Sequence, residues 1–120
     1  MANAFVHSEL NTTDVGKAKG FYGKLFDWKL EDVPMGGDTY TLIKVAGGTG
    51  GGIMKNPVPG APSNWLVYVQ VDDLAAATQK AKSLGATVMK DVTEVMGAGW
   101  FSIIVDPTGA PLGLWKPKQA

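Results

Sequence analysis

The residues best suited to chemistry lie on one short stretch near the start of the chain. Residues 5–12 read FVHSELNT, and the polar residues His7, Glu9 and Asn11 recur at every second position. Because successive side chains of a strand point to opposite sides, this spacing predicts a β-strand that carries all three on one face. An imidazole and a carboxylate placed in this way could act as an acid/base pair. A solvated strand face, or a structural pair joined by hydrogen bonds, is the plainer interpretation, and the sequence favours it.

A glycine-rich run at residues 47–52 is a second candidate for binding. Successive backbone N–H groups can cradle an anion. The run lacks the Gly-Lys-Ser/Thr ending of a phosphate loop, however, and no helical pattern follows it. We therefore interpret it as a mobile hairpin loop.

Three aromatic residues of the second half, Tyr68, Trp100 and Trp115, could line a pocket for a flat or cationic ligand. Trp100 precedes a run suited to a strand, 101–105, and Trp115 ends a second such run, 112–115. The two runs flank Asp-Pro-Thr-Gly, a sequence typical of turns. This stretch predicts a hairpin that closes a sheet. The aromatic residues could equally belong to an ordinary core or a dimer interface, and the sequence leaves both interpretations open.

The composition argues against several classes of protein. Lysine and arginine number 11 and aspartate and glutamate also number 11, so no net charge favours nucleic acid or an anionic membrane. The absence of cysteine excludes disulfides, thiolate catalysis and cysteine-based zinc sites. No apolar run approaches the roughly 18 residues of a membrane helix, and no signal-peptide pattern opens the chain. We expect a cytoplasmic protein with no nucleic-acid or membrane partner.

The elements that would position the candidate residues occur twice in the same order, β-α-β-β-β. We expect one domain over residues 1–120, with a first unit at 5–55, a proline-rich linker at 56–63 and a second unit at 64–116. Strands are expected at 5–12, 28–33, 40–45, 52–55, 65–71, 87–91, 101–105 and 112–115. The predicted fold class is α+β: two βαβββ repeats form curved mixed sheets, with helices on the convex faces and a concave cleft.

A helix is expected after each of two candidate N-cap pairs, Thr13-Asp14 and Asp72-Asp73. Gly85 is suited to the left-handed residue that ends the second helix. The apolar stripe of the first helix comprises Val15, Ala18, Phe21, Tyr22, Leu25 and Phe26, and that of the second comprises Leu74, Ala77, Ala81 and Leu84. On the strand at 65–71, the side predicted to face a helix carries Trp65, Val67, Val69 and Val71. The opposite side carries Leu66, Tyr68 and Gln70, a mixture of apolar and polar groups that suits a binding cleft.

The sequence as a whole resembles a known family. It is similar to the vicinal oxygen chelate superfamily, which includes glyoxalase I, bleomycin resistance proteins and extradiol dioxygenases, and most of all to its small glyoxalase-like branch. The matching stretches cover nearly the whole chain: residues 9–14 (ELNTTD), 21–28 (FYGKLFDW), 40–42 (YTL), 65–73 and 106–110 (DPTGA).

The resemblance also implies where metal ligands would stand, because metal-dependent members place one ligand on the first and one on the last strand of each half. These positions correspond to His7, Met54, Leu66 and Gly113. Only His7 among them binds such an ion well, and Glu9 could add a carboxylate. Two ligands are too few for zinc, nickel or iron. We therefore expect neither a metal nor another cofactor.

These considerations favour a metal-independent, small-molecule-binding protein similar to glyoxalases and bleomycin resistance proteins, with an apolar or aromatic ligand. The alternative is a small lyase, isomerase or dioxygenase-like enzyme acting on a small carbonyl or hydroxylated compound, with His7 and Glu9 as its candidate catalytic residues. The predicted ligand-binding residues are His7, Glu9, Asn11, Met54, Leu66, Tyr68, Gln70, Trp100 and Trp115.

We also expect a homodimer. Large apolar residues remain after the helix-facing positions are filled, namely Trp28, Met54, Trp100 and Trp115.

Overall fold

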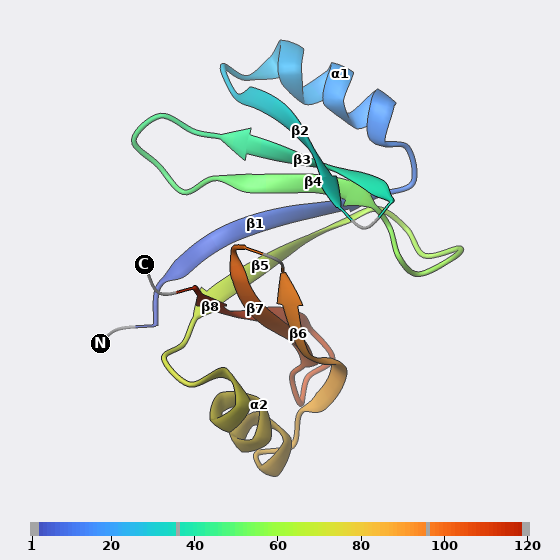
Figure 1. The fold of residues 1–120 in the computed structure, drawn as a ribbon. Helices are drawn as coiled ribbons and strands as arrows, with labels where there is room; N and C mark the ends of the chain where they lie inside the picture. Colours follow the sequence, from blue (N-terminus) through green and yellow to red (C-terminus); the bar gives the residue numbers. More distant parts are fainter. Residues whose placement is uncertain (1–2, 36, 96, 119–120) are drawn as a thin grey trace. The chain divides into compact units, whose positions relative to one another are not determined.

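The computed structural model describes residues 3–35, 37–95 and 97–118. The fold is α+β, as predicted, and the order β-α-β-β-β occurs twice (Figure 1). The chain divides into two compact units; the first comprises residues 7–66, and the second comprises residues 67–118 with residues 3–6. The elements are β1 (Phe5–Thr12), α1 (Val15–Leu25), β2 (Lys29–Met35), β3 (Asp38–Lys44), β4 (Gly51–Lys55), β5 (Asn64–Gln70), α2 (Leu74–Ser83), β6 (Thr87–Val95), β7 (Gly99–Val105) and β8 (Pro111–Pro117).

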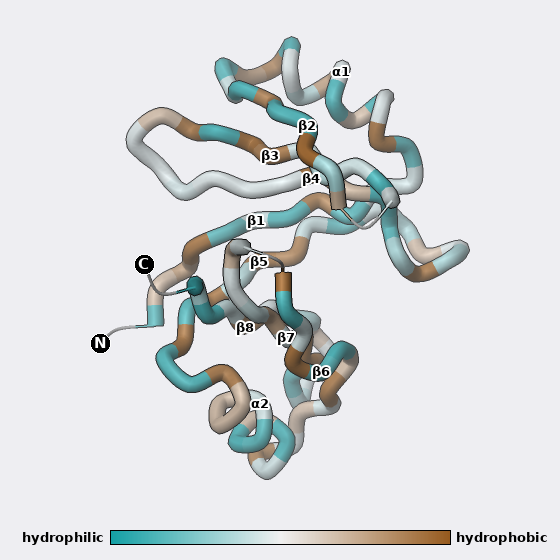
Figure 2. The backbone as a smooth tube through the Cα atoms, in the orientation of Figure 1, coloured by the Kyte–Doolittle hydropathy of each residue, from teal (hydrophilic) through white to brown (hydrophobic). Residues whose placement is uncertain are grey.

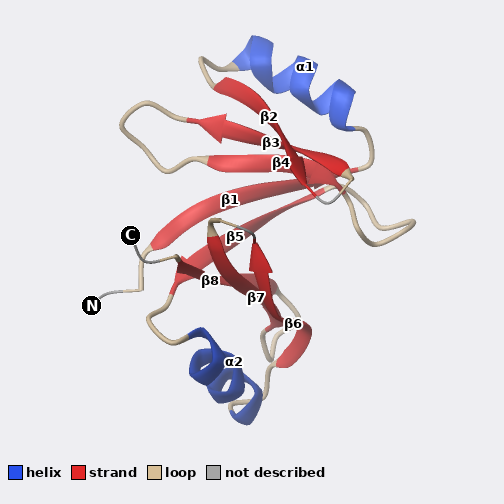
Figure 3. Cartoon of the chain, in the orientation of Figure 1, coloured by secondary structure: helices blue, strands red, loops and turns tan. Residues whose placement is uncertain are grey.

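In the first unit the strands lie in the order β2-β3-β4-β1. β1 runs parallel to β4, whereas β3 is antiparallel to both β4 and β2. Figure 3 shows α1 lying along this sheet. The buried residues Leu10, Ile43 and Ile53 form the core beneath the helix, and Val15, Ala18 and Tyr22 of α1 pack against them.

The apolar stripe of α1 is narrower than the sequence predicted. Phe21 and Leu25 are 58% and 54% exposed, so their predicted place in the core is wrong. At about 100° per residue, Phe21 lies about 60° or more from each of Val15, Ala18 and Tyr22 and is therefore on the flank of the helix. Leu25 follows the stripe but is the last residue of the helix. Leu84, which was predicted on the apolar stripe of α2, is also exposed. It is the C-cap residue, and the helix ends before it.

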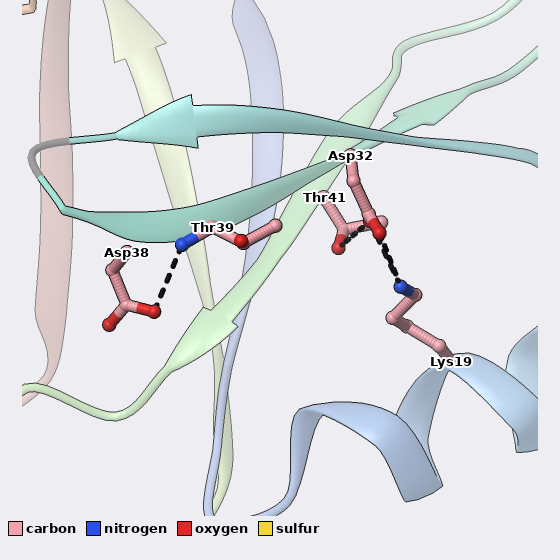
Figure 4. A network of polar contacts seen from close by, with 5 residues as sticks. All are labelled: Lys19, Asp32, Asp38, Thr39 and Thr41. Carbon is pink, nitrogen blue, oxygen red and sulfur yellow. Dashed lines mark hydrogen bonds and ion pairs between the residues drawn. The ribbon is translucent and has the colours of Figure 1, made fainter.

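A polar network joins α1 to the same face of the sheet (Figure 4). The Lys19 ammonium donates to both carboxylate oxygens of Asp32 at 2.9 and 2.8 Å, and the Thr41 hydroxyl donates to one of them at 2.7 Å. The hydrogen bond from Lys19, followed by that from Thr41, lowers the pKa of Asp32. Thr41 is fully buried, and through Asp32 the network links α1 to β2 and β3.

The glycine run at residues 47–52 is not simply a mobile loop. It appears as a long pale stretch leading into β4 (Figure 2), and its last two residues, Gly51 and Gly52, are buried positions of that strand. A Cβ at Gly51 would overlap the Ser8 carbonyl oxygen, and one at Gly50 would lie 2.7 Å from the Ile43 carbonyl oxygen. The glycines therefore allow three backbone segments to approach closely.

In the second unit the strands lie in the order β5-β8-β7-β6, and α2 packs on β6, β7 and β8. Its core consists of the buried residues Leu74, Ile104 and Leu114. The Asp73 carboxylate accepts a hydrogen bond from the Ala76 N–H, and Gly85 has φ +104°, so the predicted ends of this helix are confirmed. The predicted β7–β8 hairpin is also confirmed by its antiparallel register.

Most strands extend further than the sequence suggested. β6 continues to Val95 and contains register shifts, and β2 reaches Met35 through Pro34, which was predicted to lie in a turn. Pro34 is tolerated because β2 is an edge strand. In the described part of the chain, neither helix is long and apolar enough to cross a membrane.

Candidate functional site

Three polar side chains form a hydrogen-bonded chain on the first unit, on the face of the sheet away from α1. The Tyr40 hydroxyl lies 2.8 Å from His7 Nε2 and donates to Glu9 Oε2 at 2.8 Å. His7 and Glu9 come from β1, and Tyr40 comes from β3. Leu10, Ile43 and Ile53 are turned toward the helix, so the strand alternation sends the three polar residues to the other side. We call them the His7–Tyr40–Glu9 network.

The direction of the hydrogen bonds sets the protonation of the histidine. The Tyr40 hydroxyl has a single proton, and this proton lies toward Glu9 Oε2. The phenol oxygen then accepts from His7, which must carry its proton on Nε2. Burial lowers the pKa of His7, because desolvation disfavours the charged imidazolium. Near neutral pH the imidazole of the network is therefore neutral.

A glycine makes room for this arrangement. Gly52 lies opposite Glu9 in the parallel register of β1 and β4. A Cβ at Gly52 would overlap the hydroxyl and ring of Tyr40, so the ring lies directly on the backbone of β4. Sequence reasoning placed His7 and Glu9 on one face but missed Tyr40, whose approach depends on the register of three strands. The signal was the glycine itself, since a glycine inside a strand often marks a close approach.

Two further residues predicted to bind ligand lie on the same face of the first unit. Asn11 is buried, and Met54 is half-buried directly opposite it in the β1–β4 register. The structure thus brings His7, Glu9, Asn11 and Met54 together with Tyr40. Leu66, another predicted residue, is buried in β5.

On the second unit the structure regroups the predicted aromatic residues. The Tyr68 ring lies on Gly113 and meets Phe101 edge-on, with ring centroids 6.3 Å apart. Trp115 lies opposite Phe101 in β7 and opposite Gln70 in β5, so these side chains share the face of Tyr68. Phe101 was missed by sequence reasoning, although it is the neighbour of Trp100 on a strand where only one of the two can face that side.

Trp100 is separated from this group. It projects to the opposite face, where it packs against the core formed by Leu74, Ile104 and Leu114. The ammonium of Lys116 lies 5.9 Å from the centre of its ring. The structure therefore does not bring Trp100 together with Tyr68 and Trp115.

The donor chemistry does not fit a metal ion of the kind the resemblance implied. Of the four corresponding positions, Met54, Leu66 and Gly113 offer no nitrogen or oxygen side-chain ligand. Across residues 3–35, 37–95 and 97–118, no three His, Asp or Glu side chains gather closely enough to hold an ion. His7 and Glu9 are instead joined through the Tyr40 hydroxyl.

Two βαβββ units, each with its helix on one sheet face, define the class of protein to which the resemblance pointed. A family model of the Glyoxalase/Bleomycin resistance protein/Dioxygenase superfamily matches residues 4–114. The chain belongs to this superfamily, which confirms the resemblance seen in the sequence.

Similar proteins include one whose name refers to a glyoxylase and one whose name refers to anthracycline biosynthesis. The chain is 40% identical over 117 residues to "Putative glyoxylase CFP32" of Mycobacterium bovis, a match that covers 92% of this chain and 44% of that protein. It is 26% identical over 125 residues to "Anthracycline biosynthesis protein DnrV" of Streptomyces peucetius, covering 90% of this chain and 45% of that protein. The chain thus spans less than half the length of these relatives.

The fold is also similar to that of methylmalonyl-CoA epimerase from Mycobacterium tuberculosis. The TM-score is 0.73 at 16% identity, with 96% of this chain and 88% of that chain covered. At this level of identity the similarity concerns the fold alone.

Proposed function

We propose that the chain binds a small organic molecule at the His7–Tyr40–Glu9 network and does so without a metal ion. The observation that carries this proposal is the pair of 2.8 Å hydrogen bonds that join an imidazole, a phenol and a buried carboxylate on one sheet face. Buried polar groups that converge on one place are typical of the groups that orient a ligand. Together they supply donors and acceptors, which suits a ligand with a carbonyl or hydroxyl oxygen.

The rest of the ligand is expected to be apolar or aromatic. Met54 flanks the network on the same face and offers an adaptable apolar surface. The donor set supports metal independence, because only His7 among the four implied positions carries a good ligand for such an ion.

A second candidate function is a lyase or isomerase reaction on a small carbonyl or hydroxylated compound. The continuity of the network favours it, because a neutral imidazole hydrogen-bonded to a phenol and carboxylate can accept a proton and have the resulting charge stabilised. The name of one similar protein, "Putative glyoxylase CFP32", supports this candidate.

The two candidates can be tested with one set of variants. Thermal unfolding is followed with a panel of 2-oxo acids, 2-hydroxy acids and their thioesters, including methylmalonyl-CoA, because a molecule that binds only the folded state raises the melting temperature. A ligand of the network should raise it in the wild type but much less in Tyr40→Phe and His7→Gln. Tyr22→Phe is the matched control, since its ring packs on the helix side of the sheet.

Any ligand found is then incubated with the protein in deuterated water, where exchange of a carbon-bound proton, followed by NMR, identifies the enzyme and its absence favours the binding protein. Zinc, nickel and manganese salts should leave the melting temperature unchanged. A stoichiometric metal whose removal by chelator lowers the melting temperature would contradict metal independence. A ligand whose effect survives in both network variants would show that binding takes place elsewhere.

A further inference from the structure

A small hollow lies on the other face of the same sheet, the face toward α1. Its volume is about 120 Å³, and its walls include Trp28, Trp65, Val45 and Ser8. The helix-facing orientation follows from the register, because Ser8 and Gly51 alternate with Glu9 and Gly52 of the opposite face. The hollow belongs to the first unit alone and is separate from the His7–Tyr40–Glu9 network.

One wall of the hollow is a supported group of aromatic rings. The indoles of Trp28 and Trp65 meet edge to face, with centroids 6.4 Å apart and planes at 74°. Tyr22 of α1 contacts both, at centroid distances of 5.7 and 5.5 Å. Phe26 packs on Trp28 at 4.7 Å. Because each indole is held by neighbouring rings, the wall is preformed.

The opposite wall is backbone from the glycine run. The Ser8 N–H donates to the Gly50 carbonyl oxygen at 3.3 Å, and the Gly48 N–H donates to the Val45 carbonyl oxygen at 3.3 Å. The loop is thus bonded to β1 and to the residue that follows β3. Side chains at Gly50 and Gly51 would meet neighbouring backbone, and as glycines these residues contribute none to fill the space. The hollow is therefore a consequence of the local fold.

The chemistry of the lining restricts what fits. None of the described residues around the hollow carries a charge; indole rings and aliphatic side chains dominate, and Ser8 and Thr49 add hydroxyl groups. Cavities of about 150 Å³ with apolar walls accept benzene. Aromatic groups also pack favourably edge to face or offset against indoles. A single ring with a hydroxyl group matches this size and lining.

We propose that this hollow is a binding site for a neutral, monocyclic aromatic group of phenol size. It receives either a small phenolic compound or the aromatic end of a larger one. The Ser8 hydroxyl faces the hydroxyl of the ligand, and the two indoles contact its ring. This site does not depend on the proposed function, because the network lies on the opposite face.

The four tryptophans of the chain provide an internal control for a test by NMR. Phenol is titrated into the protein while the indole N–H signals are followed. Trp28 and Trp65 should shift in a saturable manner, whereas Trp100 and Trp115, which belong to the second unit, should not. Cyclohexanol, which has the hydroxyl but no aromatic ring, should bind at least five-fold more weakly.

Variants locate the site. Val45→Phe should fill the hollow and abolish the shifts, with Val92→Phe, an exposed residue of the second unit, as the matched control. If Val45→Phe does not fold, Trp65→Leu provides the second test; this residue is 41% exposed, and its loss should weaken phenol binding several-fold. Ser8→Ala should weaken phenol but not toluene.

Three results would overturn the proposal: no saturable shift, equal shifts at all four indoles, or unchanged binding in folded Val45→Phe. Tetramethylammonium binding in place of phenol would also overturn it, since the site would then select cations. A failure here leaves the network untouched, and Tyr40→Phe should not alter phenol binding.

Discussion

The contact between Tyr40 and Gly52 can be tested directly with a methyl group. In Gly52→Ala, the new Cβ would overlap the phenol ring and hydroxyl of Tyr40. Gly52 is not among the glycines with positive φ, so the alanine backbone itself is unstrained. The ring must therefore move away, and its hydrogen bonds to His7 and Glu9 must lengthen or break.

The cost follows from these two effects. Overpacking in a filled site costs about 1–3 kcal/mol. A hydrogen bond to a charged group contributes about 1.5–3 kcal/mol, and the bond from Tyr40 to the buried Glu9 carboxylate belongs to this class. Part of the loss is offset by about 0.4–1 kcal/mol, because alanine restricts the unfolded chain. We expect Gly52→Ala to lower the free energy of unfolding by about 2–5 kcal/mol.

A double-mutant cycle separates this steric cause from a general effect of the substitution. In a Tyr40→Ala background the overlap is gone, so Gly52→Ala should be neutral or stabilise by up to about 1 kcal/mol. Gly20→Ala in α1 is the matched control; a Cβ there meets nothing within 4 Å, and the variant should be about 1 kcal/mol more stable. Urea unfolding of the single and double variants gives the coupling energy. Equal effects of Gly52→Ala in both backgrounds would refute the placement of Tyr40 on β4.

Three further predictions follow from burial and exposure. His7 is the only histidine, and burial lowers its pKa in the folded chain. Below about pH 6.5 the unfolded chain therefore binds more protons than the folded chain. The contribution of His7 to the free energy of unfolding should be complete above that pH and should fall as the pH decreases toward the folded pKa. His7→Gln should flatten this slope between about pH 6.5 and 5 in urea unfolding, and a slope that persists would assign the effect to another group. Leu25 is 54% exposed, so Leu25→Ala should change the free energy of unfolding by no more than about 0.5 kcal/mol. Leu10 is 4% exposed, and Leu10→Ala should lower it by about 2–5 kcal/mol. Equal losses would contradict the core described above. Sedimentation equilibrium should show a homodimer, in which exposed residues such as Phe21 and Phe26 are covered; a single species at 12.6 kDa would contradict it.

The order of elements could be predicted from the sequence because its signals are local. An aspartate side chain caps each helix, as the positions of Asp14 and Asp73 indicated. The Asp-Pro-Thr-Gly turn places Asp106, whose carboxylate accepts from the backbone of Thr108 and Ala110. Each of these features involves residues within a few positions of one another, so the printed sequence contains the whole interaction.

The predictions that were wrong concern which residues are buried. Phe21 and Leu25 are apolar and recur at helical spacing, yet both are more than half exposed, Phe21 on the flank of α1 and Leu25 at its end. Apolar type alone does not show how wide a helical face the sheet can cover. The glycine run was predicted to be a loop up to the strand at 52–55, but that strand already includes Gly51. Gly51 and Gly52 are both buried, and their lack of a side chain is required by neighbouring backbone and by a tyrosine ring.

The candidate site shows the same limit, and the two units show its physical origin. In each unit a tyrosine ring lies on a glycine of the last strand: Tyr40 on Gly52, and Tyr68 on Gly113. The tyrosines come from different strands, however, β3 in the first unit and β5 in the second. Tyr68 lies opposite Gly113 in the parallel register, which is the place that Glu9 has opposite Gly52. The second unit therefore has a tyrosine where the first has a carboxylate, and its ring meets Phe101. Both units have a glycine on the last strand that leaves room for a tyrosine ring. Where the ring comes from β3, the first strand of the unit keeps its polar side chains, and the face is polar. Where the ring comes from β5 itself, the face is aromatic. That choice depends on strand register, which is why His7 and Glu9 could be paired from the sequence and Tyr40 could not.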